Sequence, residues 1–319
     1  MESTGELPST EFLGVALKAV SVGRGSFRVG SLTVHQLSDG TERAPRASWF
    51  NGIDPTVWVP VVGVRDAAAL FSVNYGCFVI AGRGPVTLID TGVGSRGHER
   101  VRLEGAGQMM ERLAEIGIGR NDVDVIVQTH LHSDHCGWLV DDDRGTLGFP
   151  HAIVHLQQRE LEYWTTAASD DNPMSPFVRS RIDPLRAAGR ISTFDDQLQV
   201  SPNITAIPTP GHTPGHASVV VESDGVSALL LGDVAHHPVH IEHHDWLPRI
   251  DMDPQESIRS RARMAALAAD TNAIVTAPHM PIMTLGRVRR SGDHYKYIPI
   301  QTAADDHDAD VVRDRHPDA

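Results

Sequence analysis

Apolar and polar positions alternate with a period of two in the first third of the chain. Residues 27–30 and 32–37 alternate like a short hairpin, and the Ser-Asp-Gly segment at 38–40 is typical of a turn. Two further apolar runs, 75–81 and 86–89, flank a Gly/Pro-containing turn. This part of the chain therefore predicts antiparallel strands.

From residue 107 onward, stretches of helical spacing separate short β-branched or apolar runs. The clearest helix start is Asp253 followed by Pro254, a side chain that can cap the first turn and a residue suited to its first position. The predicted helices are 107–116, 157–167, 176–188 and 254–269. The predicted strands are 123–128, 152–156, 191–194, 204–207, 217–221, 227–231 and 273–276. This alternation predicts a single α/β domain over residues 25–300.

Three segments fall outside this regular pattern. Residues 1–24 are expected to be a flexible leader, and the acidic, polar residues 301–319 a disordered tail. Residues 41–72 look loop-like but contain Trp49, Phe50 and Trp58. We expect these aromatic side chains to wall a pocket; the alternative is a flap packed on the core.

Composition narrows the function classes. A net charge of −13 over 319 residues argues against nucleic acid or an anionic membrane as partner, because both require a basic surface. The two cysteines, Cys77 and Cys136, exclude a disulfide scaffold and suit a reducing compartment. No signal-peptide or membrane-spanning pattern is apparent. We expect a cytoplasmic protein that acts on a small molecule.

Histidine changes this picture, because many of the 18 histidines cluster. His130, His132, Asp134 and His135 follow directly on the apolar run 123–128. Imidazole together with carboxylate is a ligand set that zinc and similar divalent metals favour. Three later strands also end near such a residue, namely His212, Asp233 and His279. Because strand ends meet at one edge of an α/β sheet, these side chains are expected to converge.

The order His-x-His-x-Asp-His, then a distal His, Asp and His, resembles the metallo-β-lactamase superfamily. The phrases Leu-Ile-Asp-Thr-Gly at 88–92 and Gly-His-Thr-Pro-Gly-His at 211–216 are also typical of that family. The likeness extends over roughly residues 26–300. Within the superfamily, the layout is most similar to the methyl parathion hydrolase and quorum-quenching lactonase group, on the segments at 37–41 and 286–288.

The resemblance implies a four-layer αβ/βα sandwich and two divalent metal ions, zinc first, with manganese, iron or cobalt as alternatives. His130, His132 and His212 would bind the first ion. Asp134, His135 and His279 would bind the second, and Asp233 and a hydroxide would bridge the two. Asp90 would orient the ligand shell, unless it is only a turn residue; Cys136 is interpreted as a packed bystander and His216 as a helper or core residue.

The implied activity is hydrolysis, in which the metal-bridging hydroxide attacks an ester or lactone carbonyl. Phosphotriester or phosphodiester hydrolysis is the alternative, and β-lactamase activity a weaker one. Asp134 and His236 are the candidate catalytic residues. His236 stands three residues after Asp233, where related lactonases carry a tyrosine; it would assist the carbonyl or the leaving group, or else be a solvent-facing loop residue.

Other assignments fit the sequence less well. A diiron oxygen or nitric oxide reductase would carry a carboxylate at position 132 and a flavin domain. A non-catalytic metal-binding protein is disfavoured by the intact ligand set. The neighbouring histidines would line the pocket mouth or bind adventitious metal: His237, His240, His243 and His244. We also expect a homodimer.

Overall fold

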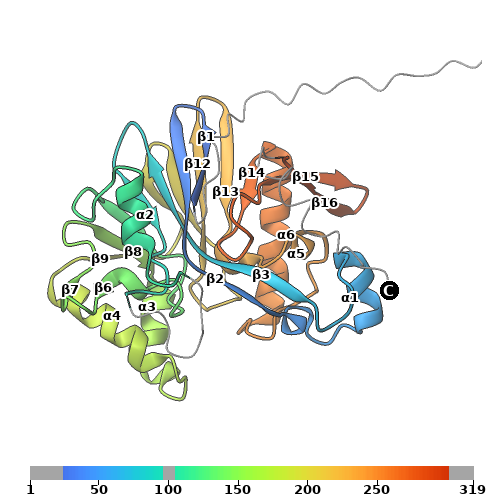
Figure 1. Ribbon diagram of the computed structural model, residues 1–319, viewed down its shortest axis with the longest axis horizontal. Helices are drawn as coiled ribbons and strands as arrows, with labels where there is room; N and C mark the ends of the chain where they lie inside the picture. Colours follow the sequence, from blue (N-terminus) through green and yellow to red (C-terminus); the bar gives the residue numbers. More distant parts are fainter. Residues whose placement is uncertain (1–23, 96–104, 302–319) are drawn as a thin grey trace, which may run out of the picture.

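The computed structural model describes residues 24–95 and 105–301. The expected leader, apart from Arg24, and the expected tail, apart from Gln301, lie outside the described residues. Within them, two seven-stranded sheets lie against each other and helices cover the outer face of each (Figure 1). The α/β sandwich expected from the sequence is therefore confirmed. None of the described helices is long and apolar enough to cross a membrane.

The first sheet has the order β1-β2-β3-β4-β5-β8-β9. Its first four strands pair antiparallel, while β4, β5, β8 and β9 run parallel. Parallel neighbours place their carboxyl ends at the same edge. The strands are β1 Arg24–Val29, β2 Leu32–Pro45, β3 Leu70–Ala81, β4 Thr87–Ile89, β5 Val125–Val127, β8 Ile153–Gln157 and β9 Ile191–Phe194.

The second sheet is antiparallel except for the pair β13 and β14, which the long helix α6 connects. Its strands are β10 Leu198–Ser201, β11 Ile204–Pro208, β12 Ala217–Ser223, β13 Val226–Leu230, β14 Ile274–Thr276, β15 Gly286–Ser291 and β16 His294–Pro299. A separate pair consists of β6 Val140–Asp141 and β7 Thr146–Leu147.

Helices form the outer layers (Figure 1). Helices α2 Met109–Glu115, α3 Gln158–Thr165 and α4 Ser175–Ala187 accompany the first sheet, and α5 Val239–Glu242 and α6 Pro254–Thr271 the second. Helix α6 begins as expected, because the Asp253 carboxylate accepts the backbone N–H groups of Gln255 and Glu256. The short elements are α1 Pro55–Val62, η1 Ala47–Phe50, η2 Gly137–Leu139, η3 Ala167–Ser169 and η4 Gly232–Val234.

The central core lies between the two sheets. It is built from inward-facing residues of both, such as Phe27 and Phe78 from the first sheet and Val219 and Leu230 from the second, all buried. Each such side chain contributes roughly 1.5–3 kcal/mol by leaving water. Alternation along each strand fixes which face is buried, since a shift of one residue would expose the whole set.

The turn expected at 38–40 is wrong. Strand β2 continues through it, and the pairing with β3 shifts register between Ser38 and Thr41. The cause is Asp39, whose buried carboxylate accepts backbone N–H groups of Val93, Gly94 and Met109 and the indole N–H of Trp138. A residue type typical of turns thus lies at a β-bulge, where its side chain holds the neighbouring loops in place.

Candidate metal centre

All seven predicted ligand residues come together at the carboxyl-end edge of the two sheets. The loop after β5 supplies His130, His132, Asp134 and His135. His212 follows β11, Asp233 follows β13 and His279 follows β14. Two groups of donor atoms that match the predicted ligand sets each lie within 4.8 Å of one another: His130, His132, His212 and Asp233 in one, and Asp134, His135 and His279 in the other. A third such group joins His236 to Asp233 and His279.

Asp233 faces both groups. Its Oδ2 lies 3.2 Å from His212 Nε2 in the first group and 3.2 Å from His279 Nε2 in the second. Its Oδ1 lies 3.4 Å from His135 Nε2. A single carboxylate thus lies between two imidazole-rich groups and contacts both.

The donors fit divalent metals by their chemistry as well as by their distances. Asp233 Oδ1 and His135 Nε2 are buried and have no hydrogen-bond partner among the described residues. Buried polar atoms without a partner are rare because leaving them unpaired is costly. A set of imidazole nitrogens and carboxylate oxygens, without thiolate, suits zinc and related ions in a catalytic rather than a structural site.

Burial and the charge of Asp233 shift the pKa values of the imidazole donors in opposite directions. Burial lowers the pKa of His132 to about 3 and that of His130 well below its usual range. Burial would raise the pKa of Asp233, but His279 and His135 outweigh it and hold that pKa well below its usual range. Burial would also lower the pKa values of His135, His212 and His279, but Asp233 outweighs it and raises them, that of His212 to about 9. Metal binding at these three imidazoles would therefore release protons.

Contacts at the Nδ1 atoms fix the orientation of two of the predicted ligand imidazole rings. His135 Nδ1 lies 2.9 Å from Asp90 Oδ2, and His279 Nδ1 lies 3.1 Å from the carbonyl oxygen of Asn74. These contacts turn the Nε2 atoms toward Asp233. Asp90 also accepts the backbone N–H and hydroxyl of Thr129 and has a positive φ of 60°. Asp90 therefore both orients the predicted ligand His135 and adopts a backbone conformation found in tight turns, the two roles that the sequence offered as alternatives.

Two buried carboxylates at this centre escaped sequence reasoning. Asp251 Oδ1 lies 2.9 Å from His212 Nδ1, and its Oδ2 accepts a hydrogen bond from Arg261 at 2.9 Å. Glu160 on α3 accepts from the backbone of Leu131 and of Gly215, and thereby ties together the loops that bear His132 and His212. Neither lies in a recognisable motif, so spacing gave no signal for them.

His236 is buried at the centre and is not solvent-facing. Its Nε2 lies 3.3 Å from Asp233 Oδ2, and its ring stacks on His279 with centroids 5.2 Å apart. Neither ring nitrogen has a hydrogen-bond partner among the described residues. Burial lowers the pKa of His236 to about 4, although Asp233 opposes this shift. The neutral ring has polar atoms available at the pocket.

The other histidines near His236 and His212, apart from the predicted ligands, are not part of the pocket lining. His240 Nδ1 accepts the backbone N–H of His236, and its Nε2 donates to the carbonyl of Trp49. His216 Nε2 accepts the backbone N–H of Asp233 and so supports that residue. His237, His240, His243 and His244 do not line the pocket beside the centre. Cys136 is buried, with its Sγ 3.6 Å from the carbonyl oxygen of Leu131.

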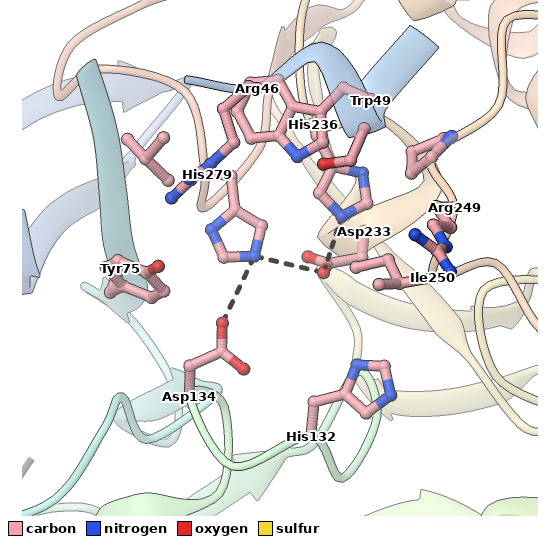
Figure 2. Close-up of a pocket in the computed structure, with 13 residues that line it drawn as sticks. Arg46, Trp49, Tyr75, His132, Asp134, Asp233, His236, Arg249, Ile250 and His279 are labelled. Carbon is pink, nitrogen blue, oxygen red and sulfur yellow. Dashed lines mark hydrogen bonds and ion pairs between the residues drawn. The ribbon is translucent and has the colours of Figure 1, made fainter. Parts of the chain in front are cut away.

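A pocket of about 220 Å³ opens onto the centre (Figure 2). Trp49 lines it as expected, whereas Phe50 and Trp58 do not; these two stack on each other at 4.4 Å in a buried aromatic cluster. The lining residues are Arg46, Ser48, Trp49, Val73, Tyr75, His132, Asp134, Asp233, His236, Pro248, Arg249, Ile250 and His279. These lining residues come from six separate segments of the chain, 46–49, 73–75, 132–134, 233–236, 248–250 and residue 279.

Comparison with known proteins agrees with this arrangement. A family described as the metallo-beta-lactamase superfamily matches residues 75–279. N-acyl homoserine lactonase AttM of Azorhizobium caulinodans is 31% identical over 170 residues, 52% of this chain. The chain spans 61% of that relative's length. An N-acyl homoserine lactonase of Bacillus thuringiensis is 23% identical over 229 residues, covering 66% of this chain and 82% of the relative.

Solved structures share the fold over most of the chain. AidC, described as a dizinc quorum-quenching lactonase, superimposes with a TM-score of 0.73 at 21% identity, covering 90% of this chain and 98% of its own. The hydrolase AbOPH in the beta-lactamase superfamily also gives a TM-score of 0.73, at 25% identity, covering 89% of this chain and 99% of its own.

Proposed function

The chain belongs to the metallo-β-lactamase superfamily, and from this membership we propose that it is a dinuclear metal-dependent hydrolase of esters or lactones. The observation that carries the proposal is Asp233, a buried carboxylate within 3.2 Å of imidazoles from two separate donor groups at the floor of a pocket. Relatives described as N-acyl homoserine lactonases support the choice of a cyclic ester as substrate.

In this proposal His130, His132 and His212 would hold one ion, Asp134, His135 and His279 would hold the other, and Asp233 would be shared between them. Zinc suits this donor set best. When bound, two such ions lower the pKa of a water nucleophile and stabilise the anionic tetrahedral state. The role of the surrounding chain is to hold the seven donors in place and to position the substrate.

His236 is the proposed hydrogen-bond donor toward the substrate. It lines the pocket beside Asp233, and its ring nitrogens are not engaged elsewhere. From there it can donate to the developing oxyanion or give a proton to the departing alkoxide. Asp134 is the alternative proton carrier. It also lines the pocket, and its side chain is 22% exposed, more than the 7% of its neighbour His279. Trp49, Val73 and Ile250 supply apolar wall.

The test is metal analysis combined with a substrate panel. Protein reconstituted with zinc should contain two equivalents and hydrolyse lactones or aryl esters faster than phosphotriesters, phosphodiesters or β-lactams. Chelation should abolish turnover, and added zinc should restore it. Two equivalents of zinc with turnover of phosphotriesters alone would favour the phosphoryl alternative. One equivalent or less in excess zinc would contradict the dinuclear proposal.

A further inference from the structure

The pocket carries two arginines although the chain as a whole has a net charge of −13. Among the described lining residues, Arg46 and Arg249 are the only charged ones besides Asp134 and Asp233. Those two carboxylates are assigned to the metals, whose charge would more than offset them. With both metals bound, the pocket would therefore be a cationic cleft in an acidic protein.

The charge of Arg46 is already paired. Its guanidinium forms an ion pair with Glu42, and the same carboxylate accepts the hydroxyl of Tyr75 at 2.9 Å. The guanidinium also lies over the ring of Trp49, 5.7 Å from its centroid. These contacts neutralise Arg46 and fix it as part of the wall.

Arg249 differs in every one of these respects. It is exposed, and its guanidinium has no hydrogen bond or ion pair with any residue that the structure describes. Its backbone is fixed nevertheless, because its N–H donates to the carbonyl of Ser48 at 2.8 Å. Figure 2 shows Arg249 beside Ile250, on the side of the pocket away from Tyr75. An unpaired guanidinium is thus held at the rim of the cleft.

We propose that the pocket takes an ester or lactone that carries a second, anionic group, a carboxylate, which Arg249 binds at the rim. This inference rests on the proposed function. Guanidinium matches carboxylate geometry with two parallel N–H donors. The exposed Ile250, 54% accessible, and the ring of Trp49 offer apolar contact to the chain between the two ends of such a substrate. Hydrolysis adds water across the acyl C–O bond and leaves the distal carboxylate unchanged.

The test compares two aryl esters of equal chain length, mono-p-nitrophenyl adipate and p-nitrophenyl hexanoate, which differ only in the terminal carboxylate. Arg249→Ala should lower kcat/KM for the adipate ester by about two- to fivefold relative to the hexanoate ester, because the lost ion pair is exposed. Arg249→Glu should reverse the preference, and Arg249→Lys should keep part of it. Added salt should weaken the wild-type preference.

Arg289→Ala is the matched control, because Arg289 is an exposed arginine on β15 that does not line the pocket. It makes the same change in net charge and should leave the ratio of the two esters unaltered. If Arg249→Ala changes both esters equally, or acts no differently from Arg289→Ala, the proposal is overturned.

A binding measurement separates this inference from the proposed function. Calorimetry of zinc-loaded protein should show that adipate binds more tightly than hexanoate, and that Arg249→Ala removes the difference. That result would support the rim site even if neither ester were hydrolysed, an outcome that would count against the proposed esterase activity alone. Equal binding of adipate and hexanoate by the wild-type protein would overturn the rim site.

Discussion

Asp251→Asn tests whether the metal centre depends on a carboxylate that binds no metal itself. The side chain of Asp251 is fully buried, and each oxygen has a charged or polarised partner, His212 Nδ1 and the Arg261 guanidinium. Asparagine fills the same volume but offers one acceptor and one donor. Its NH₂ group must then face either an imidazole N–H or a guanidinium N–H, so one buried donor loses its acceptor.

Two separate losses follow from this substitution. Removing one partner of a buried ion pair costs about 3–5 kcal/mol of folding stability. Losing the carboxylate that orients a ligand imidazole weakens metal binding by about 10–100-fold, which corresponds to roughly 1.4–2.8 kcal/mol. The weaker metal binding should affect only the site that contains His212. One of the two zinc equivalents should therefore become easier to remove.

The assay is competition for zinc with a chelator of known affinity, performed well below the unfolding temperature, together with thermal unfolding of the metal-free protein. Asp270→Asn is the control, since Asp270 pairs with Arg290 on the surface, where both side chains are more than half exposed. It should change both measurements little. If Asp251→Asn lowers only the unfolding temperature and both zinc equivalents keep wild-type affinity, Asp251 does not orient His212 for metal.

Three further outcomes are expected. Asp233→Ala should leave less than one zinc equivalent after reconstitution, because both donor groups share that carboxylate; retention of two equivalents in elemental analysis would contradict the bridge. His236→Ala should lower kcat by at least about tenfold with unchanged zinc content, and His236→Tyr should be tolerated better; wild-type kinetics in the alanine variant would make His236 a bystander. Trp49→Ala should raise KM, whereas the buried Trp58→Ala should instead cost about 3–5 kcal/mol of stability in denaturant titrations; an unchanged KM in Trp49→Ala would refute its role as pocket wall.

That the predicted ligand residues would lie together could be predicted from the sequence, because each lies in a loop that follows a short apolar strand. Strand β5 brings four of them into one loop, and parallel pairing with its neighbours fixes the edge at which they emerge. Local spacing and sheet topology were sufficient for this step. Asp251 and Glu160 could not be found in this way, because their partners lie 39 residues away at His212 and 55 at Gly215.

The pocket wall was predicted in part for a related reason. A stretch rich in aromatic residues indicates large buried surface, but the choice between lining and supporting positions depends on tertiary packing. Trp49 reaches the pocket, while Phe50, one residue later, points into the cluster with Trp58. The prediction of a turn at Asp39 was wrong because of tertiary packing as well. The four groups that donate hydrogen bonds to its carboxylate come from distant segments.

One short segment, residues 247–252, carries the pocket rim and also supports the predicted ligand residue His212, and this limits which residues can alter specificity. Asn51 donates its backbone N–H to the carbonyl of Leu247, which anchors the segment to the aromatic stretch at one end. At the other end Asp251 binds His212, and the next backbone N–H donates to the His212 carbonyl. Between these anchors only Arg249 and Ile250 are exposed. Substitutions at these two positions can therefore change what the pocket accepts while the anchors keep His212 in place.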